Sequence, residues 1–381
     1  MRKKRSRAPE RAEDQARHER FMRRALALAR RGEGWTSPNP MVGAVVARGD
    51  RIVAEGWHRR LGAEHAEAMA LRRAGRRARG ATLYVTLEPC NHTARTPPCT
   101  DQVITSGVAR VVTGMRDPNR RVRGGGDAAL RRAGLVVVEG LLERECRALN
   151  AAFVKQALTG LPFVTLKMAM SLDGKVATAR GRRTAISGPE GARFVHGLRH
   201  ASDAILVGVR TVRVDDPLLT TRIRGAGGRA QAGKDPLRVI VDSRLRMPPG
   251  ARLLHTGSPA GTIIAAARGA ARSREARLAA EGAAIWRLPS RQGGVSLRAL
   301  MRALGERGVQ SVLIEGGPAV AVSALEERVV DRLLLLIAPR LMGVGAPGLF
   351  DRALRRPLSI KRLCTGRLGG DLLLDAELTP A

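Results

Sequence analysis

The sequence is poor in aromatic side chains, with five Phe, three Trp and one Tyr among 381 residues. Sites for single-stranded nucleic acid combine a basic groove with aromatic side chains that stack on bases. The Arg and Lys residues, which give a formal charge of +33, are instead spread along the whole sequence. We therefore expect no nucleic-acid partner, although this charge favours anionic small molecules such as phosphorylated substrates.

The sequence is also poor in cysteine and in long hydrophobic runs. Its four cysteines are Cys90, Cys99, Cys146 and Cys364. They are too few and too far apart for a disulfide-stabilised fold in a chain of this length. No apolar window approaches the ~18 residues of a membrane helix, and Arg23 and Arg24 interrupt the first apolar run. We therefore expect a cytoplasmic protein without a signal peptide or a membrane span.

The length of the chain predicts two domains, because 381 residues exceed what one hydrophobic core usually serves. The stretch Thr159-Gly160-Leu161-Pro162 has the composition of a domain boundary. We predict a basic flexible extension over residues 1–18, a first domain over residues 19–155 and a second domain over residues 160–381. Alternating helix and strand patterns make both domains α/β, with a substantially parallel sheet in the first.

Hydrophobic periodicity places the individual elements. In the first domain we predict helices over residues 19–31, 65–74, 127–133 and 143–159, a further helix opening near Cys99, a hairpin over 41–57 around Gly49-Asp50, and strands over 82–87, 108–113 and 135–139. In the second domain we predict strands near residues 163–170, 204–209, 237–242, 261–266, 310–315 and 332–338, helices over 189–200, 270–281, 296–307 and 318–327, and a mobile loop over 223–234.

One stretch of the first domain combines the residue types of a metal-dependent hydrolytic site. His65-Ala66-Glu67 is followed by Pro89-Cys90 and then by Pro98-Cys99. One imidazole and two thiolates hold zinc in three positions and leave a fourth for water, whose pKa zinc lowers from ~15.7 to ~7. His-x-Glu followed by Pro-Cys and a second Cys is the signature of zinc base deaminases, in which the Glu moves protons and is not a ligand. Here eight residues separate the cysteines, so the motif is a variant with a longer loop.

Two alternatives stay open for the residues around this motif. A closed structural zinc knuckle would use His92 as a fourth ligand, but it would leave Glu67 without a role. The stiff loop Pro38-Asn39-Pro40 is compatible with a simple entry turn and equally with an Asn held rigidly to bind the polar edge of a ring.

The second domain contains a strand, an acidic residue, two glycines and a helix start within residues 312–318. Glycines at such a turn let backbone N–H groups approach a phosphate, whose charge the helix N-terminus favours. A tight strand-to-helix turn without a ligand fits the spacing nearly as well. No Gly-x-Gly-x-x-Gly fingerprint is present, so we do not predict a Rossmann domain.

Longer motifs carry a family resemblance. They are His65-Ala66-Glu67, the loop Ser37-Pro38-Asn39-Pro40-Met41-Val42-Gly43, the run Thr86-Leu87-Glu88-Pro89-Cys90 with its continuation to Pro98-Cys99, and Gly114-Met115-Arg116-Asp117-Pro118-Asn119. Together they closely resemble the bifunctional deaminase/reductase family of riboflavin biosynthesis, in which the longer cysteine loop is usual. The resemblance continues into the second domain and covers nearly the whole chain after the extension.

The resemblance implies an N-terminal cytidine-deaminase-like α/β/α domain and a C-terminal dihydrofolate-reductase-like α/β domain. It implies zinc-dependent deamination of a diaminopyrimidine ribosyl phosphate, followed by NADPH-dependent reduction of the ribosyl chain to ribityl. One Zn²⁺ per chain and NADPH are the implied cofactors. The expected partners are a phosphorylated pyrimidine and further copies of the chain in a homo-oligomer.

The resemblance also implies roles for individual residues. The zinc ligands are His65, Cys90 and Cys99, and the catalytic residues are Glu67, which shuttles protons, and Lys167, which touches the reacting substrate. The implied substrate contacts are Asn39, His58, Arg183, Arg199, Leu219, Arg222 and Glu315. The implied NADPH contacts are Ala169, Ala185, Thr211, Asp215, Ser243, Gly317, Pro318, Ala319, Val320, Ala321, Val322 and Ser323.

The sequence departs from the family pattern at two places. The family commonly has Trp-Ile where this chain has Ala185-Ile186, so an aromatic surface expected beside the nicotinamide is missing. If nothing fills that space, the loss weakens cofactor binding by ~1 to 3 kcal/mol. Arg120 stands where the family often has Pro, which is a minor change in a loop.

Two other functions compete with the bifunctional enzyme. A deaminase acting on tRNA or single-stranded DNA would bind RNA tightly with a strong salt dependence, but it would leave the second domain unexplained. A deaminase whose second domain is only a structural or oligomerisation module is the other alternative. Turnover of NADPH by the second domain would exclude it.

Overall fold

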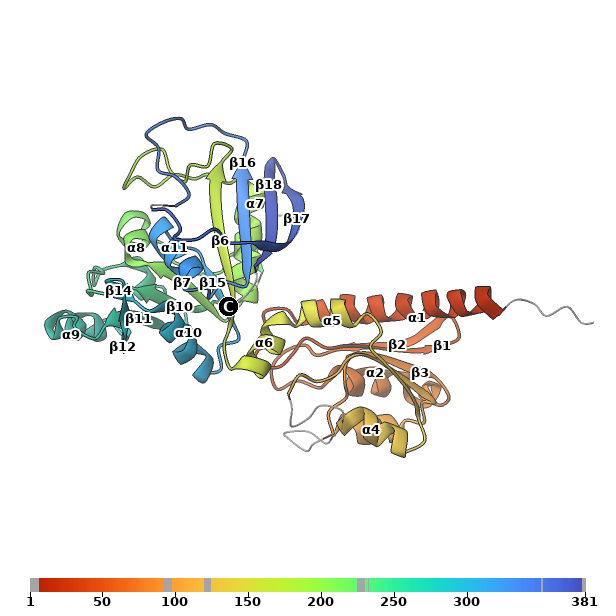
Figure 1. Cartoon of the computed structure of the whole chain (residues 1–381). Coiled ribbons are helices and arrows are strands. Elements are labelled where there is room, and N and C mark those ends of the chain that lie inside the picture. Colours follow the sequence, from red (N-terminus) through yellow and green to blue (C-terminus); the bar gives the residue numbers. More distant parts are fainter. Residues whose placement is uncertain are drawn as a thin grey trace, which may run out of the picture. The chain divides into compact units, whose positions relative to one another are not determined.

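The computed structural model describes residues 7–91, 98–119, 125–224, 230–231, 233–350 and 352–378. The chain forms two compact units, Met1–Thr159 and Gly160–Ala381, coloured red to yellow and green to blue in Figure 1. Among the described helices, none is long and apolar enough to cross a bilayer.

Unit 1 is a mixed five-stranded sheet between two layers of helices. Its elements are α1 (Arg7–Ala29), η1 (Arg30–Gly32), β1 (Gly43–Arg48), β2 (Arg51–Trp57), α2 (Ala66–Ala74), η2 (Gly75–Ala78), β3 (Thr82–Leu87), α3 (Cys99–Thr105), β4 (Arg110–Met115), α4 (Gly125–Arg132), β5 (Val136–Glu139), α5 (Glu143–Leu149) and α6 (Ala151–Thr159). The strand order is β2-β1-β3-β4-β5. Figure 1 shows α1 and α5 on one face of this sheet and α2 and α4 on the other.

The predicted elements of unit 1 are present, with three corrections. The helix predicted over residues 143–159 is divided at Asn150 into α5 and α6. The hairpin is confirmed, because β1 and β2 pair antiparallel around residues 49–50. The sheet is less parallel than predicted: only β3, β4 and β5 run parallel, and β1 is antiparallel to both of its neighbours. The first helix begins at Arg7, not near residue 19, so the segment predicted to be a flexible extension is helical from Arg7 onward. That segment consists mainly of good helix formers, and it lacks the apolar periodicity by which buried helices are recognised.

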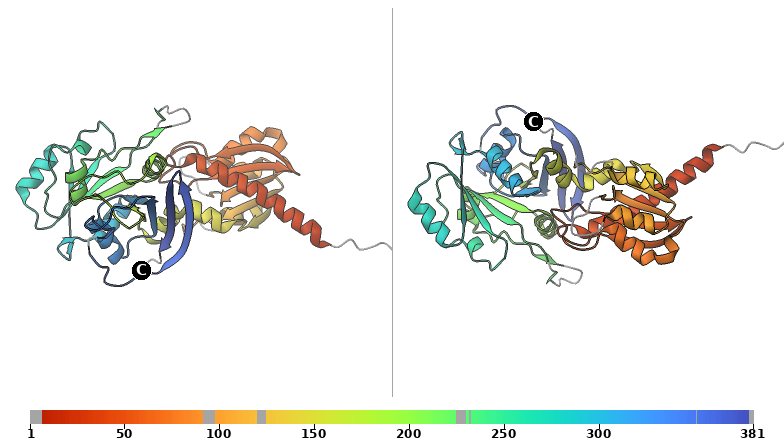
Figure 2. Two further views of the ribbon diagram at one scale, coloured as in Figure 1. Left: turned by 90° about the horizontal axis from the view of Figure 1, so that it is seen from above. Right: turned by 90° about the horizontal axis from the view of Figure 1, so that it is seen from below.

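Unit 2 contains a nine-stranded sheet with helices on both faces (Figure 2). Its first elements are β6 (Phe163–Ser171), α7 (Pro189–Ala201), β7 (Ala204–Gly208), α8 (Val209–Asp215), β8 (Ile223–Arg224), β9 (Ala230–Gln231), β10 (Leu237–Val241), η4 (Arg252–Leu254) and β11 (Thr262–Ala267). They are followed by α9 (Arg272–Ala280), β12 (Ala284–Leu288), β13 (Ser290–Arg291), β14 (Gly294–Val295), α10 (Leu297–Glu306), β15 (Ser311–Ile314), α11 (Pro318–Glu326), β16 (Arg332–Ala338), β17 (Ile360–Leu368) and β18 (Asp371–Leu378).

The strand order of the large sheet is β12-β11-β10-β7-β15-β6-β16-β18-β17. In this order, all strands from β12 through β16 are parallel to their neighbours. Strand β18 is antiparallel to β16, and β17 is antiparallel to β18. Successive side chains of a strand point to opposite faces. Accordingly Leu206 of β7 belongs to the core beneath α10 and α11, whereas Ile205 and Val207 belong to the core beneath α8 and α9.

The sequence did not predict α8, β12 or the β17–β18 hairpin of unit 2. The predicted mobile loop over residues 223–234 has paired ends instead, because β8 and β9 form a two-stranded ribbon. The remainder of that prediction, over residues 225–229 and 232, lies outside the described residues.

Candidate functional site

Three elements of unit 1 bring one imidazole and two thiols together. His65 is the N-cap of α2, Cys90 lies in the loop after β3, and Cys99 is the first residue of α3. His65 Nδ1 lies 3.1 Å from Cys99 Sγ and 3.8 Å from Cys90 Sγ. The three candidate ligand atoms all lie within 4.8 Å of one another. Two sulfurs and one imidazole nitrogen at this spacing fit zinc, which binds Cys and His in tetrahedral sites.

The surroundings of this cluster favour a thiolate. The backbone N–H of Cys99 donates to Cys90 Sγ at 3.4 Å. Hydrogen bonding from the Cys99 thiol, together with the neighbouring His65 imidazole, lowers the pKa of the Cys90 thiol well below its ordinary value. A metal ligand must be deprotonated, so Cys90 is prepared for a cation.

Glu67 lies in the first turn of α2 and is buried. Burial raises the pKa of its carboxyl group to about 7, although the nearby His65 opposes that shift. A group with a pKa near neutrality can both accept and release a proton, as a general acid–base catalyst must. A bound cation would lower this pKa and favour the ionised, proton-accepting form.

Asn39 and His58 form a second polar pair in unit 1. Asn39 Nδ2 lies 3.2 Å from His58 Nε2, and His58 Nδ1 lies 3.2 Å from the carbonyl oxygen of Glu64. Burial lowers the pKa of His58, which favours a neutral ring that donates from Nδ1 and accepts at Nε2. The His58 and His65 rings meet edge to face with their centroids 5.5 Å apart. The loop Pro38-Asn39-Pro40 therefore lies beside the cysteine cluster, and the side-chain amide of Asn39 is hydrogen-bonded to the His58 ring.

A buried asparagine that the sequence did not single out anchors this loop. Asn150 Oδ1 accepts from the Met41 backbone N–H at 2.8 Å, and Asn150 Nδ2 donates to the Met41 carbonyl at 2.9 Å. The two residues are 109 positions apart in the sequence, so no local pattern could have linked them.

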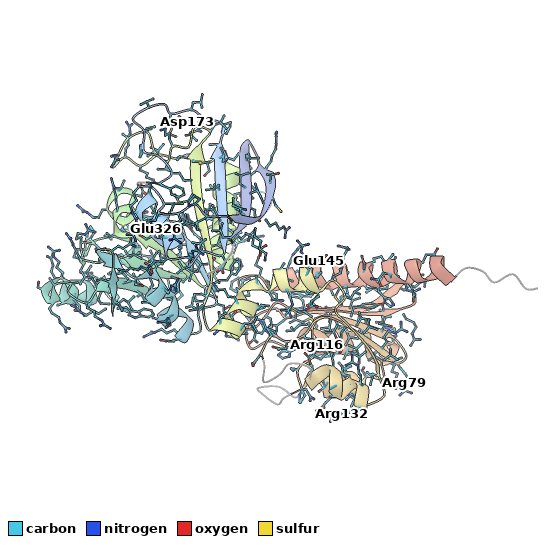
Figure 3. The ribbon with its side chains drawn as sticks, in the orientation of Figure 1. Arg79, Arg116, Arg132, Glu145, Asp173 and Glu326 are labelled. Carbon is cyan, nitrogen blue, oxygen red and sulfur yellow. The ribbon has the colours of Figure 1, made fainter. Side chains whose placement is uncertain are left out.

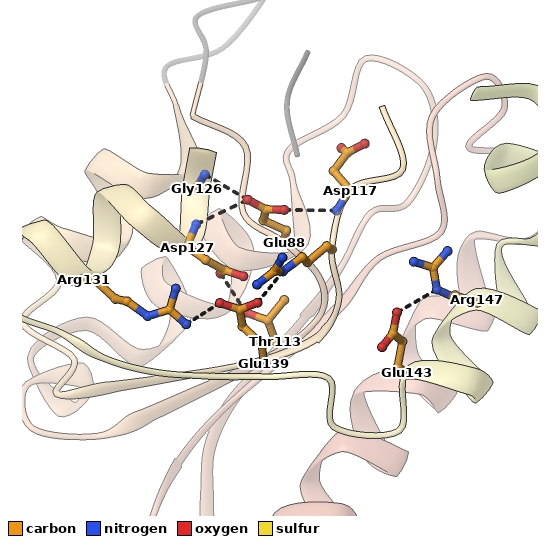
Figure 4. Close-up of polar contacts among 10 residues, drawn as sticks. Glu88, Thr113, Asp117, Gly126, Asp127, Arg131, Glu139, Glu143 and Arg147 are labelled. Atoms are coloured by element: carbon orange, nitrogen blue, oxygen red, sulfur yellow. Dashed lines mark hydrogen bonds and ion pairs between the residues drawn. The ribbon is translucent and has the colours of Figure 1, made fainter. Parts of the chain in front are cut away.

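A second unpredicted anchor, Glu88, lies two residues before Cys90 (Figure 4). Its buried carboxylate accepts backbone hydrogen bonds from Asp117 at 3.1 Å, Gly126 at 3.0 Å and Asp127 at 3.4 Å. The carboxylate thus joins the loop after β3 to the loop after β4 and to the first turn of α4. His92, the alternative fourth ligand, and Arg120 lie outside the described residues.

Unit 2 contains a cavity of about 910 Å³. It is lined by Lys167, Ala169, Arg183, Ala185, Arg199, Thr211, Asp215, Leu219, Ser243, Glu315, Gly317, Pro318, Ala319, Val320 and Ser323, among other residues. These are all the residues that the sequence suggested for the second domain except Arg222, Ala321 and Val322. Ala321 and Val322 are buried on α11, Ala321 within the core beneath α10 and α11, and Arg222 is exposed.

One end of the cavity carries a buried ion pair. Arg199 donates to both carboxylate oxygens of Glu315 at 2.6 and 2.9 Å. The Lys167 amine faces the same carboxylate, and its pKa is lowered by desolvation, which Arg199 reinforces and Glu315 opposes. At the end where β6 and β15 lie side by side, the cavity therefore has two basic side chains, Lys167 and Arg199, and one carboxylate, Glu315.

In the turn after β15, the backbone of Gly316 lies close to the backbone of β7. A Cβ on Gly316 would lie 2.8 Å from Val207 Cα and 3.0 Å from the Gly208 nitrogen, so only glycine fits there. The next residues, Gly317 and Pro318, open α11 and line the cavity. Exposed backbone N–H groups at a helix start suit a phosphate. The size of the cavity and this turn fit a dinucleotide cofactor such as NADPH.

Two loops that border the cavity are tied to each other at the end of unit 2 that holds Asp173 (Figure 3). Asp173 accepts from the backbone N–H groups of Met342 and Gly343. Val176 donates to the Pro347 carbonyl at 2.9 Å, and both residues line the cavity. Hydrogen bonds from the Ser171 hydroxyl and from these amides lower the pKa of Asp173 to about 2, so it stays charged near neutral pH.

The fold and the two sites define a zinc-dependent deaminase unit followed by a reductase unit. Two family models match accordingly: the cytidine and deoxycytidylate deaminase zinc-binding region over residues 15–115 and the RibD C-terminal domain over residues 162–374. Riboflavin biosynthesis protein RibD of Actinobacillus pleuropneumoniae is 41% identical over 362 residues, which cover 93% of this chain and 94% of that protein. RibD of Escherichia coli (strain K12) is 42% identical over 335 residues, which cover 86% of this chain and 89% of that protein.

Solved structures agree along the whole chain. Acinetobacter baumannii RibD, form 1, has a TM-score of 0.85 and 34% identity, covering 96% of this chain and 99% of that chain. A Thermotoga maritima protein, described as a diaminohydroxyphosphoribosylaminopyrimidine deaminase/5-amino-6-(5-phosphoribosylamino)uracil reductase, has a TM-score of 0.81 and 34% identity, covering 96% of this chain and 100% of that chain. The chain belongs to the RibD family of riboflavin biosynthesis proteins. The expected fold classes of both domains are thereby confirmed, as are the expected enzyme class and its zinc and NADPH cofactors.

Proposed function

We propose that the chain catalyses two consecutive reactions of riboflavin biosynthesis. The domain over residues 19–155 deaminates 2,5-diamino-6-ribosylamino-4(3H)-pyrimidinone 5′-phosphate by hydrolysis, and the domain over residues 160–381 then reduces the ribosyl chain to ribityl with NADPH. The observation that supports this proposal best is the cluster of His65, Cys90 and Cys99 with the buried carboxyl of Glu67 beside it. That donor set and proton shuttle match hydrolytic deamination.

In the deaminase we assign metal binding to His65, Cys90 and Cys99. Zinc held by these three residues would supply a bound water molecule with a pKa of ~7. Glu67 takes a proton from that water as it attacks the ring carbon that bears the amine, and it returns a proton to the departing nitrogen, which leaves as ammonia. Asn39 and His58 hold the pyrimidine ring through the amide and the neutral imidazole.

In the reductase we assign the ion pair and the amine at one end of the cavity to the substrate. NADPH bound in the cavity would supply the hydride for the ribose carbon that carries the nitrogen. The bond from that carbon to the ring oxygen breaks, and Lys167 gives the oxygen a proton, so the closed ribosyl ring becomes an open ribityl chain. Arg199 and Glu315 orient the sugar phosphate, and Arg183 and Leu219, which line the cavity, contact the substrate as well. Arg222, outside the lining, is assigned to the substrate by the family resemblance alone.

The remaining NADPH contacts that we assign are Ala169, Ala185, Thr211, Asp215, Ser243, residues 317–320 and Ser323. We further propose a cytoplasmic homo-oligomer without a nucleic-acid partner. The dispersed basic residues and the scarcity of aromatic side chains support the absence of nucleic acid.

The deciding experiment supplies the diaminopyrimidine ribosyl phosphate with and without NADPH and follows ammonia and NADPH oxidation separately. We expect ammonia in both cases and NADPH oxidation only after deamination. Ammonia release from tRNA or single-stranded DNA in place of this substrate would favour a nucleic-acid deaminase. Failure to oxidise NADPH with the deaminated compound supplied directly would mean that the second domain is structural.

A further inference from the structure

The cavity of unit 2 crosses several strands of the large sheet. Lys167 of β6 and Glu315, which follows β15, line one end, and Ser243 and Arg246, which follow β10, also line the cavity. The strands between these positions follow the order β10-β7-β15-β6. Neighbouring strands lie about 4.8 Å apart, so β10 is about 14 Å from β6 across the sheet. If the hydride-donating ring of a dinucleotide lies near Lys167, the end of β10 is at a distance that its adenosine half can reach.

The turn after β10 holds an arginine at this second end. Asp242 is fully buried, and its Oδ2 accepts from the Met247 backbone N–H at 2.7 Å. Its Oδ1 lies 3.6 Å from Arg246 Nε. The Arg246 side chain is 45% exposed, and within the described ranges its guanidinium has no other ion pair. The outer nitrogens of the guanidinium thus remain available to an anion in the cavity.

Ser243 adds a hydroxyl three residues before Arg246 in the same turn. Its Oγ accepts from the Val295 backbone N–H at 3.0 Å, which directs the hydroxyl hydrogen away from Val295. Ser243 and Val295 both line the cavity. A hydroxyl and an arginine that line one cavity from the same turn can both donate to a phosphate.

Among the described residues, no acidic side chain lines this end of the cavity. The carboxylates that line the cavity belong to Asp215, which faces Arg183, and to Glu315, which is bonded to Arg199. Asp242 follows the same strand, but its oxygens point into the turn and toward Arg246, so its charge is directed away from the cavity. A nearby arginine accommodates the 2′-phosphate in NADP-dependent sites.

We propose that Arg246, held in place by Asp242 and assisted by Ser243, binds the phosphate on the adenosine 2′-oxygen and so selects NADPH over NADH. The proposal rests on NADPH being the cofactor of this cavity. It assigns the discrimination to one side chain, whereas the contacts along the rest of the cavity are common to both cofactors.

The test measures direct binding of NADPH and of NADH to the full-length zinc-loaded protein by calorimetry. Arg246→Ala should weaken NADPH binding about 10- to 100-fold and leave NADH binding unchanged, because hydrogen bonds to a charged group are lost only with the phosphorylated cofactor. Arg246→Lys should keep part of the preference, because a positive charge remains. Adenosine 2′-monophosphate should compete with NADPH better in the wild type than in Arg246→Ala, whereas adenosine 5′-monophosphate should compete equally in both.

Arg213→Ala is the matched control, since Arg213 lines the same cavity from α8. It should not alter the ratio of NADPH to NADH affinity. Equal losses of both cofactors in Arg246→Ala, or a selective loss of NADPH only in Arg213→Ala, would overturn the assignment of Arg246. Wild-type protein that binds neither cofactor would instead overturn the reductase function, and this assignment with it.

Discussion

The backbone N–H of Gly126 donates a 3.0 Å hydrogen bond to Oε1 of Glu88. The two residues are 38 positions apart, and Glu88 lies two residues before Cys90. A Cβ at position 126 would lie 1.9 Å from the Pro89 carbonyl oxygen, so only glycine lets α4 begin against the cysteine loop. The start of α4 therefore supports the loop that carries a proposed zinc ligand.

Glu88→Gln should lower the stability of unit 1 and its zinc affinity together. The glutamine amide would turn an NH₂ group toward backbone N–H groups that now donate to a carboxylate, which leaves at least one buried donor unpaired at a cost of about 1 to 3 kcal/mol. Denaturant unfolding and chelator competition measure the two quantities. Glu145→Gln, at an exposed position on α5, is the control. Wild-type zinc affinity in Glu88→Gln would show that the anchor does not position the metal site.

Glu67→Gln should retain zinc but lose deaminase turnover by about 100-fold or more. The metal ligands remain, whereas the amide cannot accept the proton. Zinc content is measured by atomic absorption and ammonia by a coupled assay. The reductase should still oxidise NADPH when the deaminated compound is supplied. Undiminished ammonia release by zinc-replete Glu67→Gln would remove Glu67 from the mechanism.

Cys90→Ser should lose zinc and reduce the stability of unit 1, because metal binding free energy contributes to folding. The matched control is Cys364→Ser in β17 of unit 2, which should keep wild-type zinc content. Both are compared by metal analysis and by thermal unfolding with and without chelator. Stoichiometric zinc in Cys90→Ser would point to a different ligand set.

Asp127→Asn should stabilise the protein above pH 6. Asp127 Oδ2 is buried and has no hydrogen-bond partner within the described part of the chain. Burial, together with the neighbouring Glu88, raises the pKa of this carboxyl from 3.8 to about 6. The folded state therefore binds the proton of this carboxyl more tightly than the unfolded chain does. As pH rises from 3.8 to 6, the Asp127 carboxyl lowers the free energy of unfolding by an increasing amount.

The gain in Asp127→Asn should be about 1 kcal/mol at pH 7.5 and should shrink toward pH 4. The Thr113 hydroxyl, which donates to Asp127 Oδ1 at 3.0 Å, can still donate to the amide oxygen. Denaturant unfolding at the two pH values measures the difference. A gain of equal size at both would mean that the carboxylate charge is not its source.

Ala185→Trp should tighten NADPH and NADH binding by the same factor, of about tenfold. Ala185 lines the cavity where family members commonly carry tryptophan, and an added aromatic surface would pack on the ring that both cofactors share. Calorimetry with the two cofactors measures the effect. Weaker binding of both would indicate that Phe350, which lines the same cavity, already occupies the space.

The parts of the site that could be predicted from the sequence are those that belong to short local motifs. His65 and Glu67 could be placed at a helix start because the surrounding residues are typical of one, and α2 does begin at Ala66. The β17–β18 hairpin has one local signal, the dipeptide Gly369-Gly370 between its two strands. Glu88 and Asn150 left none, because their hydrogen-bond partners are 29 to 109 positions away and depend on how strands are ordered in the sheet.

Asp371, the first residue of β18, accepts a 2.8 Å hydrogen bond from the backbone N–H of Gly188, the N-cap of α7. Helix α7 carries Arg199, so the cavity of unit 2 depends on a strand near the end of the described sequence. All strands of unit 1 lie within residues 43–139. During synthesis on the ribosome, domains form in order of their completion. The zinc-binding unit can therefore assemble while the ribosome still holds the reductase unit unfinished.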